Sequence, residues 1–233
     1  DPECNSLIKG RKEAIQFAAQ HDIPVKATVE QPWSSDENLM HISFESGILE
    51  DPALTPQKEM FELSVDPQDA PDIKTELSVG FEAGVPVSLN GESLDPVELV
   101  ATLNRIGGEN GVGRIDIVES RFIGMKSRGV YETPGFTILH EAHRDLEGIT
   151  LTKGVLNLKD TLMPRFASLV YNGFWFSREM EVLLAMLKES QKFVSGEVKM
   201  ELYKGNIIIT GRTSPFSLYD ASIASMEDDR GVY

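Results

Sequence analysis

A dense run of charged side chains lies in the middle of this 233-residue chain, inside a segment that otherwise has the character of a strand. From Gly113 to Pro134 the sequence reads GRIDIVESRFIGMKSRGVYETP. Its first half mixes apolar with charged positions, namely Ile115, Ile117 and Val118 with Arg114, Asp116 and Glu119. Such a mixture indicates a strand with one side in the core and the other side facing a polar cavity. Gly124 and Gly129 then interrupt the segment, as a passage from strand to loop requires.

Charged groups on backbone expected to be buried are costly unless they are paired or bound to a ligand. Two interpretations therefore remain open for this segment. The charges form a structural ion-pair network between neighbouring strands, or they line a site for a zwitterionic small molecule.

The overall charge narrows the classes of partner. Lys and Arg number 22 against 37 Asp and Glu, so the formal net charge is −15. A field of this sign repels phosphate backbones and anionic membranes, and we expect neither nucleic acid nor membrane as a partner. The sequence contains no apolar run of membrane-spanning length and no signal-peptide pattern. Cys4 is the only cysteine, which excludes an internal disulfide and predicts a cytoplasmic protein, with an organelle lumen left open.

The first 30 residues predict a helix followed by a strand. Ile15, Ala18 and Ala19 have helical spacing, the helix is expected to end at His21, and residues 23–29 are expected to be extended. A single helix–strand unit cannot bury both of its faces. We therefore expect it to be the last α/β unit of a domain that lies upstream.

The remainder of the chain predicts an α+β fold with a largely antiparallel sheet and packed helices. The block from Pro32 to Pro52 is compatible either with a loop and short strand lining a site or with a surface loop. Strands are expected at 75–81, 85–89, 197–203 and 207–212, and helices at 95–107, 137–146, 155–171 (kinked or divided at Pro164) and 177–191. The glycine-rich run at 107–113 follows a helix instead of a strand, so it is not a phosphate-binding loop. His140 and His143 have no third ligand nearby, and we expect no metal site.

Two long segments carry a family resemblance. The central stretch and the block PWSSDENLMHISFESGILEDP (Pro32–Pro52) resemble signatures of argininosuccinate synthetase, and the resemblance continues from GRKEAI at residue 10 to SPFSLY at Ser214–Tyr219. It implies an ATP-dependent, AMP-forming ligase, with Mg-ATP as co-substrate, that joins citrulline to aspartate through a citrulline-adenylate. It also implies a homotetramer.

Carried over by motif position, the resemblance implies that citrulline is bound by Ser34, Ser43, Glu119 and Tyr131. A carboxylate such as Glu119 can pair with the ligand's α-ammonium group in a charge-assisted hydrogen bond. The hydroxyl groups can donate to the α-carboxylate or accept from the ligand, and the sequence leaves this choice open. No covalent enzyme intermediate is implied, so we assign no catalytic residue; the task of the protein is to position reactants and stabilise charge.

The family's phosphate-binding motif Ser-Gly-Gly-x-Asp-x-Ser does not occur in this sequence. We therefore expect residues 1–30 to end an upstream nucleotide-binding domain and residues 31–233 to form the citrulline-binding and multimerisation (synthetase) domain, inactive by itself. Phe136 stands where the family commonly has a small residue and Ser120 where Asn is usual, and a bulky Phe136 is expected to narrow the pocket. The alternative is a non-catalytic assembly or small-molecule-binding module derived from the enzyme.

Overall fold

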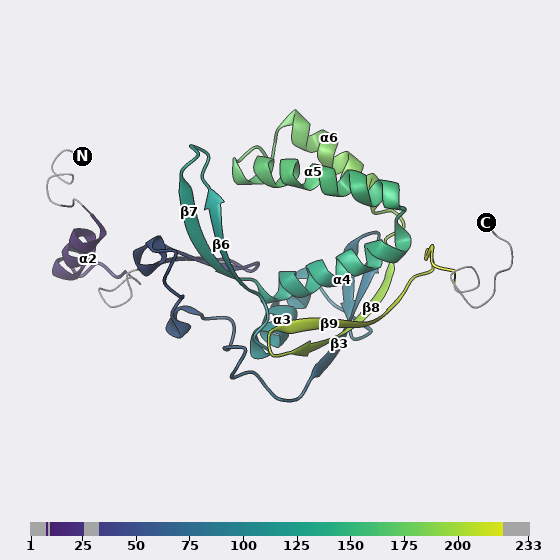
Figure 1. Ribbon diagram of the computed structural model, residues 1–233, viewed down its shortest axis with the longest axis horizontal. Helices are drawn as coiled ribbons and strands as arrows, with labels where there is room; N and C mark the ends of the chain where they lie inside the picture. The colour runs from purple at the N-terminus through teal and green to yellow at the C-terminus, as the bar shows by residue number, and fades with distance from the viewer. Residues whose placement is uncertain (1–7, 9, 26–32, 221–233) are drawn as a thin grey trace. The chain divides into compact units, whose positions relative to one another are not determined.

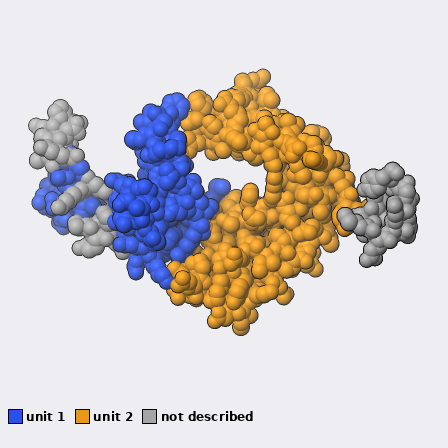
Figure 2. Space-filling model, in the orientation of Figure 1, with its two compact units in different colours: residues 1–62, 114–132 blue, residues 63–113, 133–233 orange. Residues whose placement is uncertain are grey.

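The computed structural model describes residue 8, residues 10–25 and residues 33–220. The chain divides into two compact units, shown in different colours in Figure 2. Unit 1 comprises residues 1–62 and 114–132, and unit 2 comprises residues 63–113 and 133–233. The domain boundary expected at residue 30 and the single cysteine, Cys4, lie outside the described residues.

Unit 1 contains a four-stranded antiparallel sheet with the strand order β1-β2-β7-β6. Its strands are β1 (Ser34–Glu37), β2 (Ile42–Glu45), β6 (Arg114–Ser120) and β7 (Lys126–Glu132), and its helices are α2 (Arg11–Gln20) and the short 3-10 helices η1 (Gly47–Glu50) and η2 (Lys58–Met60). The block of residues 32–52, for which two interpretations were open, thus forms a hairpin in its described part. Helix α2 ends before His21 as predicted, whereas Ile23 to Val25 have no regular structure and the rest of the expected strand falls outside the described residues.

The two faces of this sheet differ because side chains alternate along each strand. On one face Ile42, Phe44 and Val130 are buried. The ring of Phe61 packs edge-on against Phe44 with 6.2 Å between centroids, and the Arg114 guanidinium lies 3.7 Å from the centroid of Phe61. This face forms the apolar layer of unit 1. The opposite face carries mostly polar side chains of intermediate exposure, together with the exposed Ile115 and Ile117.

The expectation that the central segment is buried is wrong for β6. Ile115, Ile117 and Val118 are 40%, 40% and 56% exposed. The physical reason is the strand order: β6 is an edge strand that pairs with β7 only, so it lies beyond the apolar layer around Phe44. A loop at residues 121–125 joins the two strands into the long hairpin visible in Figure 1, and Gly124 in this loop has the positive φ of +83° that a tight turn requires.

Unit 2 is built on a five-stranded antiparallel sheet with the strand order β5-β4-β3-β8-β9. Its strands are β3 (Thr75–Glu82), β4 (Val85–Leu89), β5 (Glu92–Ser93), β8 (Gly196–Tyr203) and β9 (Asn206–Thr213), and its helices are α3 (Pro96–Glu109), α4 (Pro134–Thr150), α5 (Lys153–Tyr171) and α6 (Arg178–Ser190). Helix α4 packs on β8 and β9, α3 packs on β4 and α4, and α5 pairs with α6 (Figure 1). The predicted α+β class with largely antiparallel pairing is confirmed.

The main core of unit 2 lies between the sheet and helices α3 and α4. Alternate residues of β3 and β8 point into it, together with Leu103 of α3 and Ile138 of α4. Phe136 packs against this same core. Helices α5 and α6 have a smaller cluster of their own around Leu169 and Met180. Unit 2 therefore buries its sheet on one face only.

Several helix boundaries follow the predicted capping signals, and one does not. The Asp95 carboxylate accepts from the Val97 amide at 2.9 Å, and the Ser177 hydroxyl accepts from the Met180 amide at 3.2 Å. Helix α3 nevertheless continues past the expected end at residue 107. The glycines there serve close packing: a Cβ atom on Gly108 would lie 2.1 Å from the Leu63 carbonyl oxygen. Helix α5 is not divided: it runs from Lys153 to Tyr171 with Pro164 inside it.

Candidate functional site

The four residues predicted to bind citrulline lie on one face of the sheet in unit 1. Residues directly opposite each other in an antiparallel ladder share a face, as do alternate residues of one strand. Ser34 is opposite Glu45, and Ser43 is opposite Tyr131. Tyr131 is in turn opposite Ile115, four residues before Glu119. The register therefore gathers residues that are almost 100 positions apart in the sequence on one surface, which we call the polar face (Ser34, Ser43, Glu45, Glu119, Ser127, Gly129 and Tyr131). Asp36 and the exposed Ile115 and Ile117 share this side of the sheet.

A hydrogen bond connects the two predicted residues of the hairpin. The Tyr131 hydroxyl donates to Glu119 Oε1 at 3.0 Å. The Tyr131 ring lies over Gly129, which is buried. His41 approaches Tyr131 from the β1–β2 turn, with 6.1 Å between ring centroids. The carboxylate and the phenol thus form one polar group on the sheet surface.

Sequence reasoning assigned no site role to two charged residues of this surface. Arg121 Nη2 donates to Glu45 Oε2 and to Ser127 Oγ, both at 3.3 Å. The pairing connects the β6–β7 loop to the end of β2 through tertiary geometry, and nothing in the local sequence signals it. The Ser43 hydroxyl makes a long hydrogen bond to the Asp36 carbonyl oxygen at 3.4 Å, which a ligand can replace at little cost.

The opposite face of the same hairpin carries a structural ion pair. Arg128 donates from Nε to Asp116 Oδ1 at 2.9 Å and from Nη2 to Oδ2 at 2.6 Å, and its Nη1 donates to the Asp51 carbonyl oxygen at 2.9 Å. The Arg128 side chain is only 7% exposed. The hydrogen bonds from Arg128 lower the pKa of Asp116, and the same contact raises the pKa of Arg128. The interpretation as an ion-pair network therefore fits this face, whereas the polar face keeps the features of a binding site.

A small cavity of about 340 Å³ opens beside the hairpin, next to η1. Arg121, Lys126 and Arg128 line it, which gives it a basic character. Each of these cations has a partner inside unit 1: Lys126 donates to Ser120 Oγ at 2.8 Å, and the two arginines are engaged as described above. These bonds hold the three cations in place, and the carboxylate of Glu50 also lines the cavity.

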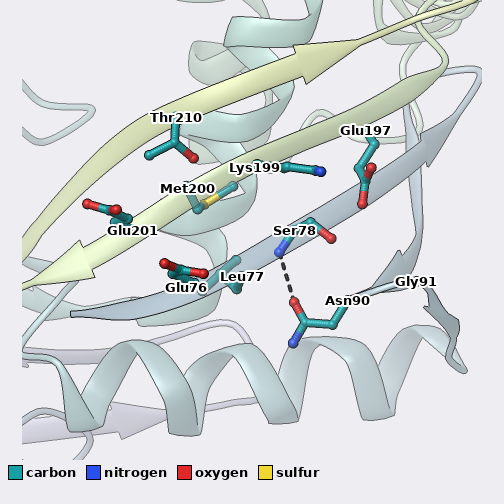
Figure 3. Close-up of a pocket in the computed structure, with 10 residues that line it drawn as sticks. All are labelled: Glu76, Leu77, Ser78, Asn90, Gly91, Glu197, Lys199, Met200, Glu201 and Thr210. Carbon is teal, nitrogen blue, oxygen red and sulfur yellow. Dashed lines mark hydrogen bonds between the residues drawn. The ribbon is translucent and has the colours of Figure 1, made fainter. Parts of the chain in front are cut away.

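The larger cavities belong to unit 2 and contain none of the four predicted residues. One, of about 550 Å³, lies on the outer face of the five-stranded sheet and is lined by alternating polar side chains of β3 and β8 (Figure 3). Three glutamates and one lysine, Lys199, line it, and one of the glutamates, Glu201, also pairs with Lys74 at 2.5 Å. The other, of about 680 Å³, is lined largely by apolar side chains such as Phe193, Phe216 and Leu218. Both cavities also contain carboxylates and hydroxyl groups, such as Glu76 with Ser78 in the first and Glu189 with Ser190 in the second, so the assignment of the site rests on the four predicted residues and not on this combination of groups.

A buried polar cluster in unit 2 accounts for one of the two histidines considered for metal binding. Glu147 is fully buried and accepts from Lys159 and from Gln191 Nε2, the latter at 2.8 Å. The His143 ring nitrogen Nε2 lies 2.8 Å from Gln191 Oε1. Burial lowers the pKa of His143. Among the residues that the structure describes, no group of three or more His, Cys, Asp or Glu side chains is arranged to hold a metal ion.

Comparison with known proteins gives the family. The family described as "Arginosuccinate synthase C-terminal domain" matches residues 33–232. The chain belongs to the argininosuccinate synthase family. It is 52% identical to the argininosuccinate synthase of Thermotoga sp. (strain RQ2), over 99% of this chain and 58% of that relative. It is 53% identical to the argininosuccinate synthase of Syntrophotalea carbinolica, over 95% of this chain and 55% of that relative.

The chain therefore spans between 55% and 58% of the length of these argininosuccinate synthases. The matched family region contains all four residues of the predicted citrulline set, so the family resemblance seen in the sequence is confirmed, and the roles of the individual residues stay predictions. No helix among the described residues is long and apolar enough to cross a membrane.

Proposed function

We propose that the polar face of unit 1 binds citrulline in an ATP-dependent ligase that joins citrulline to aspartate. The observation that carries this proposal is the hydrogen bond between Tyr131 and Glu119, on the face to which Ser34 and Ser43 also belong. A carboxylate held beside hydroxyl groups on a partly exposed surface suits the two charged ends of an α-amino acid. The matching family description and the names of the relatives support the same activity.

In this proposal the residues of the chain hold citrulline and leave its ureido end free to react. Glu119 pairs with the α-ammonium group, and the two serines lie on β1 and β2, where they contact the rest of the amino-acid moiety. The ureido oxygen then attacks the α-phosphorus of ATP with loss of pyrophosphate, and the aspartate amine displaces AMP from the adenylate. Fixing citrulline at its charged end contributes by orientation, since well-positioned reactants react far faster than freely diffusing ones.

The other substrates follow from the same proposal. ATP with Mg²⁺, and aspartate, bind mainly to the part of the longer enzyme that this chain does not span, because the phosphate-binding motif expected for the family does not occur in the sequence. By itself the chain is then inactive as a ligase. We also propose that the enzyme is a homotetramer and that it is located in the cytoplasm.

The test is citrulline-dependent release of pyrophosphate by the longest native form of the polypeptide, with Mg-ATP and aspartate present. Replacing Glu119 with Ala removes the charge-assisted hydrogen bond, and we expect KM for citrulline to rise by about 10- to 100-fold. Glu76→Ala is the matched control, because Glu76 is a carboxylate on the outer face of the other sheet. Its KM should be unchanged.

Two results would contradict the proposal. Unchanged citrulline kinetics in Glu119→Ala would remove the assignment of the site. No pyrophosphate release from a full-length native chain would favour instead a non-catalytic assembly module derived from the enzyme. Melting temperatures of both variants show that neither result comes from unfolding.

A further inference from the structure

The backbone conformation at Gly129 does not require a glycine. It lies within β7, opposite Ile117, and its φ angle is outside the left-handed region that favours glycine. Glycine inside a strand weakens the strand, and it commonly marks a place where another group approaches closely. The approaching group here is a side chain of the same strand. A Cβ atom on Gly129 would lie 2.7 Å from Cε2 and Oη of Tyr131 and 2.9 Å from its Cζ, closer than real Cβ atoms come to their neighbours.

The geometry of the ladder explains why the ring must lie there. Tyr131 is opposite Ile115 and Glu119 is opposite Ser127, so the two residues are four rows apart along the hairpin. Strands rise by about 3.3 Å per residue, which separates these rows by about 13 Å. A tyrosine standing upright from the sheet cannot span this distance. The 3.0 Å hydrogen bond to Glu119 therefore requires the ring to lie flat along β7, directly over position 129.

The hydrogen bond also decides the chemistry that this group offers to a ligand. A phenol has one hydrogen to donate, and Tyr131 donates it to Glu119. Toward a ligand, the Tyr131 oxygen can then only accept, as the carboxylate does. Two accepting groups side by side suit a donor with several hydrogens and a positive charge, such as a primary ammonium group.

We infer that Gly129 is a positioning residue, which acts through Tyr131 to build an acceptor site for the α-ammonium group of the substrate. This inference rests on the proposed function, and it deepens that proposal in two ways. It names a residue that the family resemblance did not supply, and it assigns Tyr131 to the ammonium end of citrulline. The α-carboxylate is then left to the donors elsewhere on the polar face.

The experiment compares citrulline with 5-ureidopentanoate, which is citrulline without its α-ammonium group, as substrates of the longest native form of the polypeptide. The wild type should prefer citrulline in kcat/KM. Gly129→Ala should reduce this preference by about tenfold, since the Cβ displaces the ring from its hydrogen bond to a charged group. Gly211→Ala is the control: Gly211 also lies in a strand, and an added Cβ there meets nothing within 4 Å. Its preference should stay at the wild-type value.

A second background separates the positioning role from damage to the strand. In Tyr131→Ala the ring is gone, so adding Gly129→Ala should change the preference no further. The inference is overturned if Gly129→Ala keeps the wild-type preference, or if it lowers the preference equally with and without the ring. Glu119→Ala distinguishes failure of the inference from failure of the proposed function. If Glu119→Ala no longer uses citrulline and Gly129→Ala keeps the wild-type preference, only the inference fails. If Glu119→Ala binds citrulline normally, the proposed function fails and the inference fails with it.

Discussion

The two units of this protein use charged residues in different ways. In unit 2 these charges are neutralised at short range: Glu147 is buried with Lys159 and Gln191, and Glu201 of β8 pairs with Lys74, which directly precedes β3. In unit 1 the two faces of the β6–β7 hairpin carry charged residues in different arrangements. One face carries the Asp116–Arg128 pair. On the other face Glu119 accepts from the neutral Tyr131 hydroxyl, while Arg121 pairs with Glu45 and donates to Ser127, the residue opposite Glu119.

This difference distinguishes charges that hold a fold together from charges that recognise a ligand. A carboxylate paired with a cation inside the protein has its electrostatic partner already. A carboxylate bonded to a phenol keeps its negative charge, and the proposed site for the ammonium group at Glu119 depends on this difference. Substitutions of charges that are paired inside the protein should therefore affect folding, and substitutions on the polar face should affect binding.

The largest effect should appear when two adjacent residues of β2, whose side chains lie on opposite faces of the unit 1 sheet, are substituted one at a time. Phe44→Ala removes a fully buried ring that packs on Phe61, and we expect the free energy of unfolding to fall by about 3–5 kcal/mol. Ser43→Ala, one residue earlier and on the polar face, should change stability by less than about 0.5 kcal/mol and raise KM for citrulline. Urea unfolding and steady-state kinetics measure both. Equal stability losses in the two variants would contradict the assignment of faces.

The next effect concerns the buried charge in unit 2. Lys159→Met leaves the fully buried Glu147 without its closest cation, and we expect a loss of about 3 kcal/mol in unfolding free energy. The double variant Glu147→Gln with Lys159→Met removes both charges, so it should regain much of that loss. Urea unfolding of the single and double variants measures the coupling. A double variant no more stable than Lys159→Met would show that charge pairing is not what this cluster contributes.

The sequence predicted most of the fold, because hairpin turns, alternation and caps are local signals. Four of the five strands of unit 2 and the Ser177 cap were expected where the structure has them, and only the two-residue strand β5 was not. The buried character of β6 was wrongly expected, since an edge position depends on strand order and no local pattern encodes it. The four candidate site residues came from the family resemblance, whereas the contacts of Arg121 and the crowding of Tyr131 over Gly129 required the tertiary geometry of the sheet.

A smaller effect is expected at the ion pair on the other face of the hairpin. Asp116 is 42% exposed, so solvent screens the pair and Asp116→Asn should cost no more than about 1 kcal/mol. The pKa of Asp116 is lowered in the folded protein, so its contribution is present above its ordinary pKa of about 3.9 and is lost as the pH falls through the lower folded value. Urea unfolding at neutral and at acidic pH should show the variant converging on the wild type in acid. A constant difference at every pH would contradict the pairing.

The smallest effect should be a pH dependence of stability from His143, confined to a narrow window. Burial lowers the pKa of His143, although Glu147 and the Gln191 amide beside it favour the charged form, while Lys159 and His140 oppose it. Because the folded state binds this proton less readily than the unfolded state, stability is highest above about pH 6.5. It decreases as the pH falls from there through the folded pKa of His143. His143→Gln should flatten this part of the profile between about pH 5 and 8, whereas the exposed His140→Gln should leave it unchanged. Equal profiles in wild type and His143→Gln would place the proton uptake elsewhere, and would leave the stability of the buried cluster of unit 2 independent of pH in this range.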